Sequence, residues 1–300
     1  MRQRHGCRAK TAGRPACGLT LIEVLVVVSI SALMIAILLP SLSAARDTAN
    51  TGKCLANLRE IGATSWMYAE DAAYPTQPWH LGSAQKTVVV SKVSEFVYGG
   101  FQTELTHPVR GAQVDVQQIH TNSRPYNRYI APGLCLGPIS AYVCPSDRFT
   151  VTPLFEEPCD SPAVEEALPS WMVNGNSYAV NWNWLDGLPW NGKNGIVQDI
   201  NLMSAAGSEM LRLKVGGAAS RFVLFMESPM SAYMQNARGD DEAASSSSCP
   251  PSAARGWHRR YSAFSMAFLD GHAQYRQINT GHARGTGYDT WAEPDTPIGF

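Results

Sequence analysis

The chain has 300 residues, of which 45% are hydrophobic and 16% charged, and it contains 25 glycines and 19 prolines. This composition predicts one membrane helix followed by a modest globular region that is rich in turns. The formal net charge is −1 at pH 7, and a chain without a basic surplus is not a nucleic-acid binder by charge.

An apolar segment dominates the N-terminal part of the chain. Glu23 is the only ionisable residue between Leu19 and Leu39, and about 20 apolar residues are enough for a helix to cross a bilayer. Residues 1–18 carry five basic residues and no acid, so the positive-inside rule predicts a cytoplasmic leader and a C-terminal domain outside the membrane. A carboxylate in hydrocarbon costs several kcal/mol unless it is neutralised, so Glu23 requires a partner.

The residues around this acid resemble a known family. The basic leader ends in Gly18, and it is followed by Leu19, Thr20, Glu23 at the fifth place and Pro40 at the twenty-second. This arrangement closely resembles the N-terminus of type IV prepilins and type II secretion pseudopilins. The resemblance implies that a prepilin peptidase cuts after Gly18 and methylates the new amino group of Leu19.

In such proteins the glutamate pairs with the N-terminal amine of a neighbouring subunit as the helices stack into a filament. Two charges that are each costly in lipid become tolerable when they are paired. The resemblance therefore places Glu23 and Pro40 in an assembly helix. The implied partners are other pilin subunits, membrane lipid, an inner-membrane assembly platform and an assembly ATPase. An ordinary signal anchor, with Glu23 near the headgroups, is the alternative.

Helical periodicity continues beyond Pro40, because apolar residues recur at spacings of three and four as far as Gly62. The pattern predicts a helix of about 50 residues that ends near Glu70 and is kinked at Pro40. The expected domains are a leader over 1–18, the membrane helix over 19–40, the outer half of the helix over 41–72 and an exported domain over 73–300.

The exported domain is expected to contain an antiparallel sheet. The candidate strands are Thr87–Val90, Phe222–Met226, Tyr261–Leu269 and His272–Ile278. Asp270-Gly271 is typical of a two-residue hairpin turn with positive φ angles. Residues 237–255, rich in serine and proline, are expected to form a flexible loop. The predicted fold class is α+β and pilin-like, with a long N-terminal helix against a C-terminal antiparallel sheet with long loops.

The chain as a whole also resembles a large bacterial group of pseudopilin-like proteins with an H-x9-DG motif. The matching residues are Lys53–Gly62, Tyr142–Asp147, Ser177-Tyr178, Asn181, Ser220–Glu227, His258 and Asp270-Gly271-His272. Eleven residues separate His258 from Asp270, where the group usually has nine.

Four of these residues are candidate metal ligands. Glu227, His258, Asp270 and His272 lie at expected strand ends or beside the turn, and imidazole with carboxylate suits zinc or another transition metal. A structural role is favoured, because Asp270 fits a turn and His258 could anchor a loop by bonding Asp270 or Glu227. Neither catalysis nor a cofactor is expected.

Two other segments offer binding chemistry. Asp240, Asp241 and Glu242 could hold calcium, although acids in a loop are usually only solvated. A surface of tryptophan and asparagine could bind glycan or protein, although packing between helix and sheet is favoured. These residues are Trp171, Trp182, Trp184 and Trp190 with Asn174, Asn176, Asn181, Asn183 and Asn191.

Export to an oxidising compartment permits disulfides. The cysteines beyond the leader are Cys54, Cys135, Cys144, Cys159 and Cys249. The spacing of Cys135, Cys144 and Cys159 allows a local loop closure, and the odd count leaves at least one thiol unpaired. The absence of a CxxC pair weakens the case for a tetrahedral zinc site.

The predicted function is that of a structural subunit of a type IV pilus-like or type II secretion pseudopilus filament. The alternatives are a membrane-tethered binding module and, with less support, a metal-dependent enzyme. The choice between pilus and pseudopilus, and between major and minor subunit, stays open.

Overall fold

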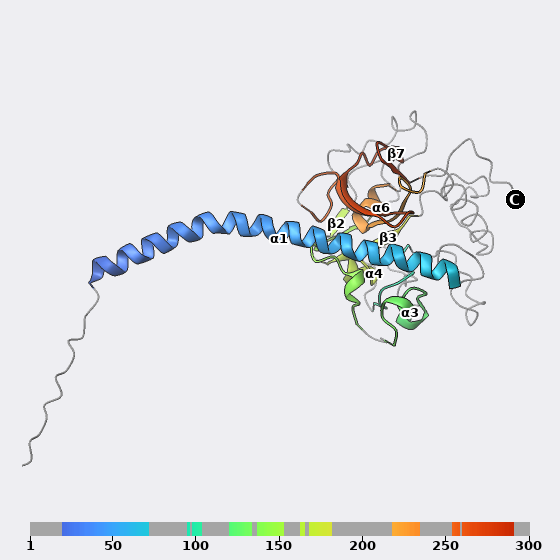
Figure 1. Ribbon diagram of the computed structural model, residues 1–300, viewed down its shortest axis with the longest axis horizontal. Helices are drawn as coiled ribbons and strands as arrows, with labels where there is room; N and C mark the ends of the chain where they lie inside the picture. The colour runs from blue at the N-terminus through green and yellow to red at the C-terminus, as the bar shows by residue number, and fades with distance from the viewer. Residues whose placement is uncertain are drawn as a thin grey trace, which may run out of the picture. The chain divides into compact units, whose positions relative to one another are not determined.

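The computed structural model contains a long N-terminal helix and a four-stranded antiparallel sheet (Figure 1). The structure describes residues 20–71, 95–96, 98–103, 120–133, 137–152, 163–165, 168–181, 218–234, 254–258 and 260–290. The predicted strand at Thr87–Val90 lies outside these ranges. Contacts divide the chain into two compact units, Met1–Arg46 and Asp47–Phe300, with the boundary inside the helix.

Helix α1 runs without interruption over Leu21–Asp71, which confirms the predicted length and end. Pro40 lies inside it and cannot donate a backbone hydrogen bond, which is the reason for expecting a kink at this position. The kink itself stays a prediction. The apolar part of α1 is long enough to cross a membrane, and none of that window is buried. Its large exposed apolar residues are Leu21, Ile22, Val24, Leu25, Val26, Val27, Val28, Ile30, Leu33, Met34, Ile35, Ile37, Leu38, Leu39 and Leu42.

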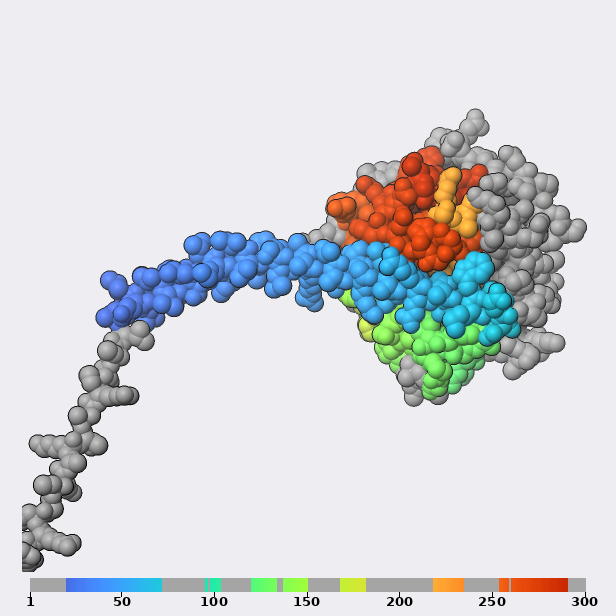
Figure 2. Space-filling view, in the orientation of Figure 1, coloured from blue at the N-terminus to red at the C-terminus, as the bar shows by residue number. Residues whose placement is uncertain are grey.

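Within the second unit, α1 packs through a single face. Cys54, Leu58 and Ile61 are fully buried, and Tyr68 continues the same stripe, as expected for residues three or four positions apart on a helix. In Figure 2 this part of the helix forms a light-blue band between the orange-red C-terminal segments and the green segments.

The sheet has the strand order β3-β4-β5-β6, with every neighbouring pair antiparallel. Its strands are β3 (Tyr178–Val180), β4 (Val223–Glu227), β5 (Ala263–Phe268) and β6 (Ala273–Gln277). The predicted strand at Phe222–Met226 and the predicted hairpin are thus confirmed. The register of β4 against β5 shifts between Val223 and Phe225, as a β-bulge does.

The sheet separates two apolar clusters. The cluster on the α1 side contains Leu224 and Phe225 of β4, which the bulge brings to the same face. The second cluster joins β5 to helix α6 (Ser228–Met234), for example through Phe264 and Met230. Both faces of the sheet are therefore buried, and on the α1 side β5 and β6 present the small residues Ala267 and Ala273.

Short elements complete the described chain. They are η2 (Thr121–Ser123), α3 (Asn127–Ile130), η3 (Ser140–Tyr142), β1 (Thr150–Thr152), β2 (Ala163–Glu165), α4 (Ser170–Asn174), β7 (Arg284–Gly285) and β8 (Tyr288–Asp289). Strands β1 and β2 pair antiparallel, as do β7 and β8.

The turn between β5 and β6 differs from the prediction. The Gly271 amide donates to the Phe268 carbonyl at 2.9 Å, and the Phe268 amide donates to the His272 carbonyl at 2.9 Å. The loop therefore has three residues, Leu269 to Gly271, and only Gly271 has a positive φ, of 89°. This is the arrangement of a turn followed by a left-handed residue, so Asp270 keeps an ordinary backbone conformation.

The predicted flexible loop over 237–255 extends two residues too far. Ala254 is buried, and its carbonyl accepts a hydrogen bond from the Ser262 amide at 2.8 Å. Arg255 forms an isolated antiparallel bridge with Tyr261. Backbone pairing thus begins directly after the serine- and proline-rich run, whose residues 237–253 lie outside the described chain.

Gly271 in the turn and Gly62 on α1, which face each other, provide a matched pair of substitutions. Gly271→Ala should lower the free energy of unfolding by about 1–2 kcal/mol, because a Cβ in the left-handed region costs that much. Gly62→Ala should leave it unchanged or raise it by up to about 1 kcal/mol, since alanine favours helix and its Cβ would lie 3.8 Å from the Gly271 Cα, an ordinary contact. Chemical denaturation of the full-length protein in detergent measures both, and equal effects would contradict this account.

Candidate functional site

The first candidate site is the beginning of helix α1. The Thr20 amide and hydroxyl both donate to Glu23 Oε2 at 2.8 Å, and the Glu23 amide donates to the Thr20 hydroxyl at 3.3 Å. This reciprocal arrangement is a capping box, and it satisfies backbone donors that a helix start leaves without partners. Gly18 and Leu19, the predicted processing residues, lie outside the described chain.

The capping box was detectable in the sequence, because threonine followed three residues later by glutamate is its signature. This local role of Glu23 was not among the predictions, which rested on its charge alone. The structure therefore adds an intramolecular partner for the carboxylate.

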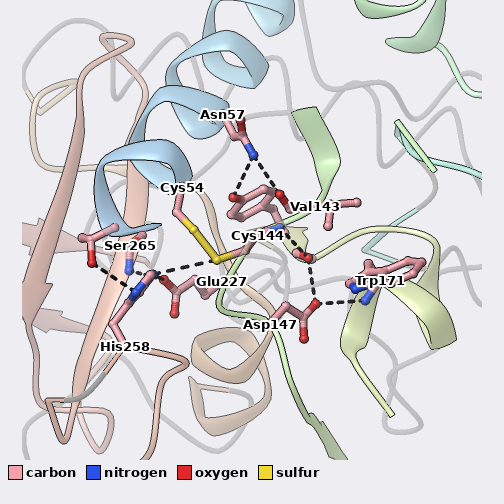
Figure 3. Close-up of a disulfide and its surroundings, with 12 residues drawn as sticks. Cys54, Asn57, Val143, Cys144, Asp147, Trp171, Glu227, His258 and Ser265 are labelled. Carbon is pink, nitrogen blue, oxygen red and sulfur yellow. Dashed lines mark hydrogen bonds and ion pairs between the residues drawn. A yellow bond between two sulfur atoms is a disulfide. The ribbon is translucent and has the colours of Figure 1, made fainter. Parts of the chain in front are cut away.

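The second candidate site is a buried cluster of sulfur, imidazole and carboxylate beside α1 (Figure 3). A disulfide joins Cys54 on α1 to Cys144, 90 residues further along the chain. His258 and Glu227 lie next to it, and all four residues are at most 5% exposed. The local closure of Cys144 with Cys135 or Cys159 is thus wrong, because the packing of α1 brings Cys54 to Cys144. Cys135, Cys159 and Cys249 lie outside the described chain.

The ring of His258 is held on both sides. Its Nδ1 lies 3.1 Å from the hydroxyl of Thr51, and that hydroxyl donates to the carbonyl of Asp47 at 2.9 Å. The Thr51 hydroxyl and Nδ1 are thus hydrogen-bond partners, and the tautomer of the ring sets which of them donates. The other nitrogen, Nε2, lies 3.2 Å from Glu227 Oε1 and 3.9 Å from Cys144 Sγ. One proton is therefore held between the imidazole and the carboxylate.

Glu227 closes the cluster from the sheet. It is the last residue of β4, and its Oε1 also accepts a hydrogen bond from the Ser265 amide on β5 at 3.0 Å. Its Oε2 is buried and has no hydrogen-bond partner within the described chain. A buried carboxylate oxygen without a partner is costly, so this atom marks a position where a further interaction would stabilise the protein.

The four predicted metal ligands do not form one constellation. Glu227 and His258 come together, with Nε2 3.2 Å from Oε1, and Glu227 is one of the two carboxylates expected to bond His258. Asp270 and His272 instead pair with each other across the hairpin turn, where the Asp270 side chain also accepts the His272 amide at 3.1 Å. In the described chain, the group of potential metal ligands is Cys54, Cys144 and His258, and the two cysteines were not among the predicted ligands.

A second buried carboxylate supports the same region. Asp147 accepts hydrogen bonds from the backbone amides of Ser170 and Trp171, at 2.8 and 3.0 Å, and from the hydroxyl of Ser177 at 2.7 Å. The Ser177 hydroxyl also accepts the Cys144 amide at 3.0 Å. Burial raises the pKa of Asp147 to about 7, although these donors lower it. Asp147 thus fixes α4 beside the disulfide.

The described part of the tryptophan and asparagine stretch is mostly interior. Asn174, Asn176 and Asn181 are buried, and the Asn181 side chain donates to two backbone carbonyls. Trp171 is only partly buried and packs near Phe101, with ring centroids 6.1 Å apart. Packing is therefore the role of these asparagines. The remaining residues of this surface, and the predicted calcium ligands, lie outside the described chain: Trp182, Trp184, Trp190, Asn183, Asn191, Asp240, Asp241 and Glu242.

The long N-terminal helix and the antiparallel four-stranded sheet define a pilin-like α+β protein. Residues 13–39 match a family model described as the prokaryotic N-terminal methylation motif, which supports a prepilin-type protein. No curated protein and no solved structure matches the chain. The apolar helix and the motif together fit a single-pass membrane-anchored protein.

The disulfide can be tested by peptide mapping without reduction. A cross-linked peptide pair should contain Cys54 and Cys144, and replacing both by serine should lower the free energy of unfolding by about 4–5 kcal/mol, as expected for a loop of this length. Mass spectrometry of the digest and denaturant unfolding provide the two measurements. Recovery of Cys144 linked to Cys135 or Cys159 would contradict the pairing.

Asp147 predicts a pH dependence of stability. Its pKa in the folded protein, about 7, lies above the usual value of 3.8, so the folded state holds a proton that the unfolded chain has lost. The free energy of unfolding should therefore fall as the pH rises from about 4 to about 7, by on the order of 1–3 kcal/mol. Denaturant unfolding of the wild type and of Asp147→Asn between pH 4 and pH 7 measures how the free energy of unfolding changes with pH. Equal slopes for the two proteins would rule out this role of Asp147.

Proposed function

We propose that this chain is a structural subunit of a type IV pilus-like or type II secretion pseudopilus filament, and that it assembles through its N-terminal helix. The observation that carries the proposal is the beginning of α1, where Glu23 lies in the first turn of a long exposed apolar segment and inside the matched methylation motif. The same features support a membrane-anchored structural protein in preference to an enzyme.

Processing would create the partner that Glu23 requires. Cleavage after Gly18 by a prepilin peptidase exposes the amino group of Leu19, which the same peptidase methylates. In a single chain the carboxylate of Glu23 is partnered by Thr20. In a filament, the amine of a neighbouring subunit would replace or supplement this local partner, because a paired acid and amine are less costly in lipid than either alone.

The remaining partners follow from this role. They would be other pilin or pseudopilin subunits, an inner-membrane assembly platform and a cytoplasmic ATPase. The leader would stay in the cytoplasm and the domain after α1 would lie outside the inner membrane, or in a surface or periplasmic filament. The likeness of the region from His258 to Asp270-Gly271 to the H-x9-DG group supports a pseudopilin-like exported domain.

A membrane-tethered binding module is the second candidate. A pocket of about 420 Å³ lies beside His258, and it is lined by basic and aromatic side chains that include Arg148, Arg260, Trp257 and Tyr261. Its size falls within the range of small-molecule sites, and its charge favours an acidic ligand, such as an acidic glycan. Such a module would be processed but would not polymerise.

Replacing the acid separates these two functions. Glu23→Ala should still be processed, but it should lower filament recovery about tenfold or more, since losing a pair worth ~1.4 kcal/mol already changes an equilibrium tenfold. Ser29→Ala is the matched control, because Ser29 donates only to the Leu25 carbonyl of its own helix. Filaments sheared from cells are quantified, and intact mass reports cleavage and methylation.

Two outcomes would count against the proposal. Normal filament recovery with Glu23→Ala would remove the role of this acid in assembly. An intact mass that includes residues 1–18 in the wild-type protein would show that the leader is retained, which is incompatible with a prepilin.

A further inference from the structure

We propose that the Cys54–Cys144 disulfide and His258 form a redox-dependent binding site for Zn²⁺ or a similar thiophilic divalent cation, with Glu227 as the fourth ligand. The oxidised protein holds the disulfide, and the reduced protein binds the metal. This inference goes beyond the filament function and does not depend on it.

The geometry of the cluster already approaches that of a zinc site. The Cys54 and Cys144 sulfurs and a ring nitrogen of His258 all lie within 4.8 Å of one another. Tetrahedral zinc with Zn–N and Zn–O bonds of about 2.0–2.1 Å separates a nitrogen ligand from an oxygen ligand by about 3.3 Å. The His258 Nε2 to Glu227 Oε1 distance is 3.2 Å.

The distance from Cys144 Sγ to His258 Nε2 is also close to the value expected for two ligands of one zinc ion. A sulfur and a nitrogen on one tetrahedral zinc lie about 3.5 Å apart when the bonds are about 2.3 and 2.0 Å long. Cys144 Sγ lies 3.9 Å from His258 Nε2. A small movement of the side chains would therefore bring the ligands to bonding distance, provided that the two sulfurs are released from each other.

The surroundings of His258 suit a metal ligand. Nδ1 is bonded to the Thr51 hydroxyl, and Nε2 is the nitrogen that faces Cys144 and the Glu227 carboxylate. A hydrogen bond from the other ring nitrogen is what usually orients a metal-binding histidine. The unpartnered Oε2 of Glu227 adds a buried acceptor that a cation would satisfy.

The chemistry balances with a dithiol as the reductant. The dithiol supplies two electrons and two protons, the Cys54–Cys144 bond breaks into two thiols, and the dithiol becomes a cyclic disulfide. Zn²⁺ then displaces both thiol protons and the proton held between His258 and Glu227. Thiolate, neutral imidazole and carboxylate are the forms that bind zinc.

The pocket beside the cluster supplies an approach from solvent. It has a volume of about 420 Å³, and His258, Gly256 and Trp257 line it. Gly256 also lies against the carboxylate, since a Cβ at this position would be 3.4 Å from Glu227 Oε2. A small reductant in this pocket would therefore meet His258 before it meets the sulfurs.

The test uses full-length protein in detergent, reduced with a phosphine that has no thiol of its own, and Co²⁺ as a spectroscopic probe for the zinc site. The reduced wild type should bind one Co²⁺ with an absorption band from sulfur-to-cobalt charge transfer, and Zn²⁺ should displace it. The oxidised protein should show no such band. A reduced wild type without the band would overturn the inference.

Matched variants separate this site from other ligands. Cys54→Ser with Cys144→Ser should abolish the band although the five other cysteines of the full-length chain remain. His258→Ala should lower the affinity by about 100-fold or more. His272→Ala is the control, since this histidine pairs with Asp270 at the turn, and it should bind like the wild type. A band that persists in the double serine variant, or an equal loss in His272→Ala, would refute the assignment.

Circular dichroism checks whether the reduced protein stays folded. If reduction unfolds the exported domain, Zn²⁺ at one equivalent should restore the native spectrum in the wild type but not in His258→Ala. Failure of Zn²⁺ to refold the wild type, or refolding of both proteins alike, would also overturn the inference.

Discussion

The globular part of the chain depends on the close packing of helix α1 against one face of the four-stranded sheet. Small residues such as Ala267 and Ala273 form part of that face, and they allow the helix to approach closely. Polar groups of α1 are paired across the contact: the Asn57 side chain donates to the Ser140 and Val143 carbonyls, and the Trp66 ring donates to the Leu269 carbonyl. Burial and hydrogen bonding therefore stabilise the same interface.

This packing also explains why charged groups are tolerated in the interior. Glu227 projects from the end of β4 into a region already closed by α1, and His258 reaches it from the loop before β5. The imidazole and the carboxylate share a proton, and the backbone of β5 donates to the carboxylate. Glu227 and His258 thus serve as a structural anchor and as potential metal ligands, because both roles require donor atoms that are buried and fixed.

The parts of the fold that depend on local patterns were predictable from the sequence, and the parts that depend on tertiary packing were not. Periodicity located the end of α1, and alternation located the β5–β6 hairpin. The link from Cys54 to Cys144 spans 90 residues and exists because α1 lies against the sheet. The sequence named both Glu227 and Asp270 as possible partners of His258, and pairing of β4 with β5 brings it to Glu227, whereas Asp270 is used by its own turn.

The disulfide has a mechanical consequence. A tensile load applied along α1 would reach residue 54, and from there a covalent bond would transmit it to residue 144 in the globular part of the chain. The helix could not slide along the face of the sheet until that bond was broken or the surrounding strands had unfolded. The attachment between helix and domain is therefore set by bond strength in the oxidised protein and by noncovalent packing alone once the bond is reduced.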